Sequence, residues 1–208
     1  MAKAREERRR ARKAKTFRRR VIALTVVVVV VVALVLFNQF GRPSPSSSPS
    51  PNPEPEPNKV LLRTSMGNIT IQLYDDMPIT TSNFEKLVKQ GVYDGTIFHR
   101  VIDGFMIQGG DPTGTGYGDP NIPNIPDEFT DHNRNNRGTV AMANSGPNTG
   151  SSQFFINLVG NNYLDDKHPV FGEVVAGMGV VDAIGKVQTD DNDRPLEPVT
   201  IISAELIE

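Results

Sequence analysis

Residues 98–111 read FHRVIDGFMIQGGD and place one fixed cation among apolar and amide side chains. Strand-forming residues lie on both sides of Gly104, which breaks the run, so the segment predicts two short strands around a tight turn. If the strands pair, alternation brings Arg100 to the same surface as Met106 and Gln108. A guanidinium stays protonated and only donates hydrogen bonds, so Arg100 suits neither nucleophilic nor general-base chemistry. The pattern indicates a site that polarises a neutral group.

A second segment, residues 142–157, reads MANSGPNTGSSQFFIN, and its small residues let a backbone come close. Taken together, the two segments resemble the cyclophilin family of peptidyl-prolyl cis-trans isomerases. The strings FHRVI.GFMIQGGDP and MAN.GPNT..SQFFI stand in the order and spacing typical of that family. The resemblance covers roughly the last 150 residues, a single-domain length. It implies a mainly β fold, a closed eight-stranded antiparallel β-barrel capped by two α-helices.

The resemblance also implies a catalytic set and a proline pocket. Arg100 would donate to the prolyl nitrogen, Gln108 would orient Arg100 and touch substrate, and Asn144 would pair with the substrate backbone. His168 resembles the rim of the pocket and completes the catalytic set. The residues implied to contact substrate are His99, Phe105, Met106, Ala143, Ser145, Gln153, Phe155, Tyr163 and Leu164. The resemblance implies no cofactor and no metal.

Several of these residues also have a plainer interpretation. For Met106, Phe155 and Leu164 it is core packing, the usual fate of apolar strand residues. For His99 and His168 it is a hydrogen-bonded structural imidazole, and a catalytic base is not expected because the reaction transfers no proton. The arginine could be an ordinary surface ion-pair residue, but its Phe, Met and Gln neighbours argue against that.

Two positions depart from the family pattern. Tyr163 stands where many eukaryotic cyclophilins have Trp, a residue that supports cyclosporin binding in the family. We therefore expect weak cyclosporin binding and an intact proline pocket. Ser145 carries a hydroxyl where Ala is frequent, a change small enough to leave activity in place.

The remainder of the domain predicts further strands and two helices. A first helix should begin near Pro78, with the cluster Thr80-Thr81-Ser82 as N-cap, and end at Gly91. A second helix should run over residues 178–186, and residues 109–138 should form an irregular loop. Further strands are expected at 60–64, 69–73, 138–142, 153–157, 170–175 and 199–206. Many short antiparallel strands with few helices favour a closed barrel, because closure removes exposed edges.

Two other patterns invite assignments that the residues do not support. GTGYG at 114–118 resembles a phosphate loop, but it lacks the following GK[ST] and a strand-to-helix setting, so a turn is the better interpretation. The carboxylates Asp127, Glu128 and Asp131 lack the spacing of an EF-hand.

The N-terminus differs sharply in composition from the rest of the chain. Residues 1–20 hold eleven Lys or Arg against two Glu, and residues 21–37 carry no charge. We expect a basic cytoplasmic segment at 1–20 and a transmembrane anchor at 21–40, oriented by the positive-inside rule. A cleaved secretory signal is the alternative, and an arginine-rich arm that binds nucleic acid is a weaker one.

Residues 41–58 contain seven Pro and five Ser and predict an extended linker before an isomerase domain at 59–208. That domain has ten Lys or Arg against twenty Asp or Glu, a net charge of −10, so nucleic acid is an improbable partner. The absence of cysteine excludes disulfides. We expect a monomer.

These observations lead to one functional hypothesis and one rival. The leading hypothesis is a membrane-anchored prokaryotic cyclophilin that accelerates X-Pro isomerisation in proteins folding outside the cytoplasm, with its N-terminus cytoplasmic and its domain extracytoplasmic. Its partners would be proline-containing segments of folding proteins and the membrane. The rival is a tethered binding module or holdase that captures such segments, with turnover incidental.

Overall fold

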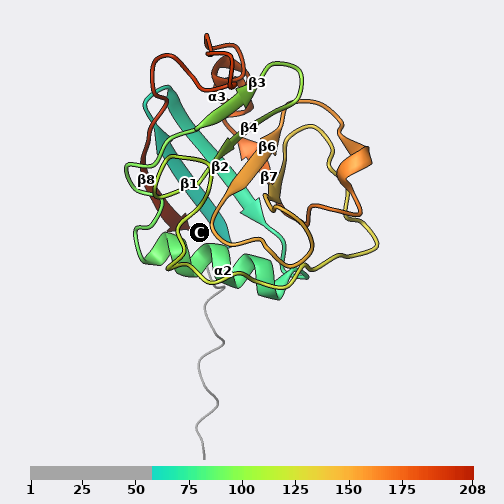
Figure 1. Ribbon diagram of the computed structural model, residues 1–208. Helices are drawn as coiled ribbons and strands as arrows, with labels where there is room; N and C mark the ends of the chain where they lie inside the picture. The colour runs from blue at the N-terminus through green and yellow to red at the C-terminus, as the bar shows by residue number, and fades with distance from the viewer. Residues whose placement is uncertain (1–57) are drawn as a thin grey trace, which may run out of the picture. The chain divides into compact units, whose positions relative to one another are not determined.

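Eight short strands, each rich in β-branched and aromatic residues, form one antiparallel sheet in the computed structural model, which describes residues 58–208. The spatial order is β3-β4-β6-β5-β7-β2-β1-β8. The strands are β1 (Lys59–Thr64), β2 (Gly67–Leu73), β3 (Arg100–Ile102), β4 (Met106–Gly109), β5 (Thr139–Met142), β6 (Phe154–Asn157), β7 (Val170–Ala176) and β8 (Ile201–Ile207). The sheet curls around a core, with the helix α2 at one end and the helix α3 at the other (Figure 1).

The predicted closed barrel is observed as a curled sheet whose edge strands do not pair in a ladder. The gap between β3 and β8 is bridged by the isolated pair Ile97 and Thr200 and by a hydrogen bond of 2.9 Å from Phe98 N to Val199 O. Further along β3, the N–H of Val101 bonds instead to the carbonyl of Asp193, at 2.8 Å. A loop therefore takes the place that a paired strand would occupy beside β3.

Three predicted segments fall wholly or mainly outside the described residues. These are the basic segment at 1–20, the membrane anchor at 21–40 and the linker at 41–58, of which only Asn58 is described. Among the helices of residues 58–208, none has the length and hydropathy needed to cross a membrane.

The helix α2 (Pro78–Lys89) begins and ends close to where the sequence predicts, but its cap is different. Pro occupies the first turn, where a missing N–H costs nothing. No side chain of the predicted cluster at 80–82 caps the helix; the carboxylate of Glu128 accepts from the N–H of Ile79 at 3.1 Å and of Thr80 at 3.0 Å. The cap therefore comes from a residue distant in sequence, and a negative charge there suits the positive end of the helix dipole.

The second helix, α3 (Met178–Ile184), is short and turns Val181 and Ile184 into the core. Gly177 precedes it at φ +86°, and a Cβ there would lie 2.1 Å from the carbonyl oxygen of Asn68. Only glycine fits that junction between the helix and β2.

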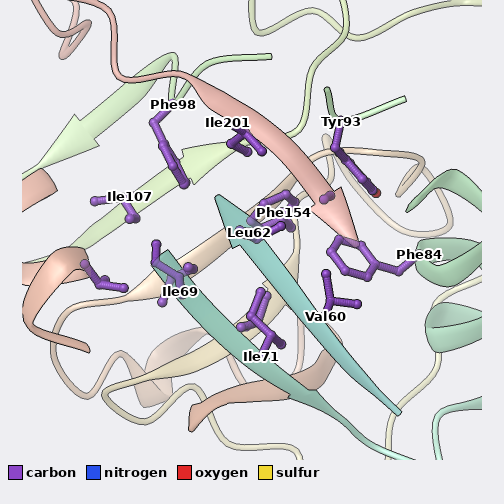
Figure 2. Close-up of a cluster of buried hydrophobic side chains, with 14 of the residues drawn as sticks. Val60, Leu62, Ile69, Ile71, Phe84, Tyr93, Phe98, Ile107, Phe154 and Ile201 are labelled. Atoms are coloured by element: carbon purple, nitrogen blue, oxygen red, sulfur yellow. The ribbon is translucent and has the colours of Figure 1, made fainter. Parts of the chain in front are cut away.

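Aromatic rings pack the core between α2 and the sheet (Figure 2). Phe84, fully buried on α2, has its ring centroid 4.9 Å from that of Tyr93, 5.4 Å from that of Phe154 and 5.0 Å from that of Phe171. Phe84 therefore joins the helix to β6 and β7, on the inner face of the sheet.

We predict that Phe84→Ala lowers the free energy of unfolding by about 3–5 kcal/mol, because it removes a buried ring from a site that cannot collapse fully. Urea denaturation would measure the change. Tyr117→Ala is the control, since Tyr117 is 96% exposed and should change stability by less than about 0.5 kcal/mol. Equal effects of the two substitutions would contradict this view of the core.

Candidate active site

Side chains that could take part in a reaction lie in a row on the outer face of β3, β4 and β6. Arg100 on β3 pairs in register with Gln108 on β4, and Gln108 pairs with Phe155 on β6. Residues that are paired across antiparallel strands point to the same face, so the three side chains lie side by side. Met106, two residues from Gln108, shares this face.

A cavity of about 230 Å³ opens on this row. Its floor belongs to a small apolar cluster of Met106, Ala141, Phe155 and Val170, which is separate from the main core. The cavity is lined by Arg100, Phe105, Met106, Gln108, Ala143, Asn144, Phe155, Leu164 and His168. All four residues of the predicted catalytic set and five of the predicted substrate contacts therefore meet in one place.

Arg100 lies at the edge of the cavity and is held by a carboxylate. Its side chain is 43% exposed, and its Nε lies 3.4 Å from Oδ2 of Asp193. Gln108, predicted to orient it, instead donates from Nε2 to Oε1 of Gln153 at 2.9 Å. Gln153 in turn donates to the carbonyl of Gly116 at 3.1 Å. Among the hydrogen bonds within residues 58–208, none involves the terminal N–H groups of this guanidinium.

His168 and Asn144 are both fixed by backbone carbonyls. Nδ1 of His168 lies 3.1 Å from the carbonyl oxygen of Met142, and its ring meets Phe155 edge-on with centroids 5.3 Å apart. Burial lowers the pKa of His168, which favours the neutral imidazole. The amide of Asn144 donates to the carbonyl of Lys167 at 2.7 Å, which ties the loop after β5 to the segment that precedes His168.

Four buried asparagines connect the two walls of the cavity. Asn161 donates to the carbonyl of Phe105 at 3.0 Å and to the side chain of Asn157 at 2.8 Å. The side-chain amide of Asn157 in turn donates to Oδ1 of Asn135 at 3.2 Å.

At the far end of this chain of amides, Asn135 and Asn133 reach the carbonyl of His168 at 3.4 and 3.3 Å, and Asn133 also accepts from the N–H of Val170 at 2.6 Å. Each of the four asparagines is at most 3% exposed. If one of their amides lost its hydrogen-bond partner, water could not replace that partner and the amide would stay buried and unpaired. The sequence analysis did not identify this network, because asparagine in a loop usually indicates only a turn.

Four of the predicted substrate contacts lie outside this cavity: His99, Tyr163, Ser145 and Gln153. His99 directly precedes β3 and is 6% exposed, and within residues 58–208 both of its ring nitrogens are buried without a hydrogen-bond partner. Burial lowers the pKa of His99. Tyr163, on the 3-10 turn Asn162–Leu164, is 65% exposed and stacks on Phe105 with ring centroids 6.3 Å apart.

The remaining predicted contacts, Ser145 and Gln153, line a larger cavity of about 570 Å³. The two cavities share Gln108, Ala143 and Asn144, so they adjoin. The larger one also includes residues that the sequence analysis did not select: Gly116, Tyr117, Gly118, Asp119, Pro120, Ile122, Pro123, Asn124, Thr149 and Ser151.

The glycine-containing loop at 114–118 is a turn built around Asp111. The buried carboxylate of Asp111 accepts from the backbone N–H of Thr113 at 2.9 Å, of Gly116 at 2.6 Å and of Gly118 at 3.2 Å. Burial raises the pKa of Asp111, but these hydrogen bonds outweigh it and the net pKa lies below the usual value. The N–H groups are therefore occupied and cannot cradle a phosphate. Within the described part of the chain, no group of three or more His, Asp or Glu is arranged to hold a metal ion.

Comparison with known proteins gives three consistent findings. The family model described as "Cyclophilin type peptidyl-prolyl cis-trans isomerase/CLD" matches residues 59–206. Peptidyl-prolyl cis-trans isomerase ppi1 of Schizosaccharomyces pombe is 52% identical over 149 residues, which cover 70% of this chain and 96% of the relative. The human peptidyl-prolyl cis-trans isomerase-like 1 is 48% identical over 149 residues, covering 70% of this chain and 90% of the relative.

A solved structure shows the same arrangement of the domain. The cyclophilin type peptidyl-prolyl cis-trans isomerase of Cryptosporidium parvum superposes with a TM-score of 0.69 at 31% identity, covering 73% of this chain and 98% of that one. A second structure of that protein, solved in the presence of the dipeptide Ala-Pro, gives the same TM-score and identity and covers 72% and 99%.

These findings correct one prediction. The sequence analysis predicted a prokaryotic protein held in the cell membrane by a single span, with an extracytoplasmic domain. The relatives are eukaryotic proteins named peptidyl-prolyl cis-trans isomerase ppi1 and isomerase-like 1, which contradicts that localisation. The predicted membrane localisation depended only on the basic and apolar composition of the N-terminus. Composition identifies no organism or compartment.

Buried His99 and half-buried His168 predict a pH-dependent stability. Their folded pKa values lie below the ordinary value of about 6.5, so at mildly acidic pH the unfolded chain binds more protons than the folded one. We expect full stability above about pH 7 and a falling free energy of unfolding as the pH drops from about 7 to 5. Urea denaturation at several pH values would measure the slope.

The slope should become flatter in His99→Gln and flattest in a double variant that also carries His168→Gln. Aspartates with lowered pKa values, such as Asp111 and Asp182, lose protons below this window and do not contribute to it. An unchanged slope in the double variant would show that other groups cause the effect.

Proposed function

This chain belongs to the cyclophilin-type peptidyl-prolyl cis-trans isomerase family and is an enzyme of that class, and we propose that it accelerates X-Pro isomerisation through Arg100. The observation that carries this proposal is a single guanidinium at the edge of a cavity of about 230 Å³ that also has apolar lining from Phe105, Met106, Phe155 and Leu164. The proposed substrates are proline-containing segments of unfolded or folding proteins.

The chemical problem is rotation about a partial double bond. Amide resonance raises the barrier to roughly 18–20 kcal/mol, and the prolyl nitrogen must recover its lone pair for the bond to rotate. A hydrogen-bond donor directed at that lone pair stabilises the twisted transition state more than either planar ground state. Arg100 can supply such a donor because its Nη groups are not engaged by Asp193.

The apolar floor would hold the proline ring while the chain on the other side of the bond rotates. Phe105, Met106, Phe155 and Leu164 offer carbon surfaces on several sides of the cavity. They exclude water from the bond, which strengthens the electrostatic effect of Arg100. The structure of the C. parvum relative solved in the presence of Ala-Pro supports a proline-containing ligand at this fold.

Polar groups at the rim would hold the substrate backbone. We assign Gln108 and Asn144 to this role because both line the two adjoining cavities, so a chain bound across them would pass both side chains. Ala143, Ser145 and Gln153 border the same path. His168, neutral and fixed by Met142, forms one side wall and transfers no proton.

The two predicted contacts that line neither cavity, His99 and Tyr163, receive supporting roles. His99 packs against the loop at Gly116, where an added Cβ would lie 3.4 Å from its ring, so it supports that loop behind Arg100. Tyr163 stacks on Phe105 and extends the apolar surface beyond the pocket.

The first test is the exchange rate of a proline-containing peptide, measured by NMR line shapes with the wild-type chain and with Arg100→Ala. We expect the substitution to lower kcat by about 100- to 1,000-fold, because it removes a donor used in the transition state. Arg63→Ala is the control, since Arg63 forms an exposed ion pair with Glu205 on the sheet edge. Activity retained in a folded Arg100→Ala variant would refute the mechanism, and no rate enhancement by the folded wild-type chain would favour a peptide-capture role.

A second test concerns cyclosporin. The exposed phenol of Tyr163 offers less apolar surface and a different donor from the indole expected in sensitive relatives. We expect inhibition to be weak in the wild type and to strengthen by about tenfold in Tyr163→Trp, measured as the inhibition constant on the peptide assay. Leu196→Trp controls for an added exposed indole. Strong inhibition of the wild type would contradict this prediction.

A further inference from the structure

The loop at residues 189–195 is folded tightly against the catalytic face. Thr189 and Pro195 form an isolated β-bridge across its base, and the carboxylate of Asp190 accepts from the N–H of Asn192 at 2.8 Å and of Arg194 at 3.0 Å. Its position is fixed on β3, where the carbonyl of Asp193 accepts from Val101 at 2.8 Å. This loop therefore has a defined shape and a fixed attachment to the strand that carries Arg100.

Asp193 adopts a backbone conformation that favours glycine. Its φ is +62°, and among residues 58–208 only Asn148, at +59°, shares this feature without being glycine. Glycine would form the same turn without the steric cost of a Cβ. A side chain retained at such a position suggests that the side chain is used.

The side chain of Asp193 contacts Arg100. Oδ2 of Asp193 lies 3.4 Å from Nε of Arg100, and within residues 58–208 this is the one side-chain partner of that guanidinium. Gln108, the neighbour in register, is engaged by Gln153. The carboxylate approaches the Nε edge of the guanidinium, which leaves the Nη groups free.

We propose that Asp193 is a positioning residue for catalysis: its carboxylate holds Nε of Arg100 so that the Nη groups face the proline cavity. The inference rests on the proposed role of Arg100. A long arginine side chain that is 43% exposed would otherwise sample several rotamers, and the unproductive ones would lower the rate.

The negative charge of Asp193 weakens the electric field of Arg100 at the cavity, whereas its contact with Nε orients the guanidinium. These two effects change the rate in opposite directions. The guanidinium charge is delocalised and its donors persist whatever the partner, and solvent screens a carboxylate that is 42% exposed. Geometry is therefore the larger effect, and removal of Asp193 should slow the reaction.

Asp193→Gly and Asp193→Asn in the full chain separate geometry from charge. Glycine keeps the backbone conformation and removes the contact, while asparagine tolerates positive φ and keeps a neutral acceptor for Nε. We expect Asp193→Gly to lower kcat by about two- to fivefold with KM unchanged, the range expected for a half-exposed ion pair. Asp193→Asn should recover part of that loss.

Two further readouts distinguish positioning from a general structural role. The Nε–H NMR signal of Arg100 should show increased mobility in Asp193→Gly and less change in Asp193→Asn. High salt should lower the wild-type kcat toward that of Asp193→Gly and leave the glycine variant unaffected.

Asp182→Asn is the matched control. Asp182 lies on α3 and forms an ion pair with Arg137 at 2.8 Å. Its side chain is 44% exposed and that of Arg137 is 49% exposed, similar to the exposure of the pair of Asp193 and Arg100. Neither Asp182 nor Arg137 lines either cavity of the catalytic face. The Asp182→Asn substitution removes one carboxylate charge, as Asp193→Asn does, and should leave kcat and the Nε–H signal of Arg100 unchanged.

Comparison with Arg100→Ala separates failure of this inference from failure of the mechanism. If Arg100→Ala abolishes activity while Asp193→Gly matches the wild type in kcat and in the Nε–H signal, Asp193 has no positioning role and the proposed function stands. If Arg100→Ala keeps activity, both the mechanism and the role of Asp193 are refuted.

Discussion

The antiparallel register of β3, β4 and β6 is the constraint on which the arrangement of side chains around Arg100 depends. It places Arg100, Gln108 and Phe155 in one row and sends their sequence neighbours Val101, Ile107 and Ile156 into the main core. A slip of one residue would exchange the two sets, burying a guanidinium and exposing apolar core residues. The cost of burying that charge and exposing those side chains keeps the register fixed. The burial that stabilises the fold therefore also fixes the positions of Arg100, Gln108 and Phe155.

The central strands are buried on both faces, and this determines where a binding cavity can form. Every residue of β5 and β6 is buried, because their inner side chains enter the main core and their outer ones form the small cluster around Phe155. The outer cluster has no second sheet to cover it. Loops supply its walls instead, and the buried amides of Asn133, Asn135, Asn157 and Asn161 set the distance between those walls.

Carboxylates in this acidic domain have a structural use beyond surface charge. Asp111, Glu128 and Asp190 each accept hydrogen bonds from two or more backbone N–H groups in long loops or at a helix start. Loops without a β-ladder need such acceptors, since buried N–H groups must be paired. Asp193, in the loop organised by Asp190, directs its carboxylate to a guanidinium rather than to the backbone. Arg100 is thus held by a loop that is itself held by a carboxylate.

The pattern of residues along the chain is enough to predict the local elements and the row of side chains around Arg100. Runs of strand-forming residues predicted the strands at 60–64 and 69–73, and the start and stop signals at Pro78 and Gly91 predicted α2. Pairing of the two strands around Gly104 predicted that Arg100, Met106 and Gln108 share one surface. These results follow from short-range geometry.

Contacts between residues far apart in the chain depend on how the chain folds in three dimensions. Asp193 meets Arg100 across 93 positions, Glu128 caps α2 across 48 or 49, and Asn161 reaches Phe105 across 56. No periodicity records such contacts, since loop paths set them. The open edge between β3 and β8 and the burial of His99 away from the cavity also depended on the packing of loops against the sheet, which a linear pattern of residues does not encode.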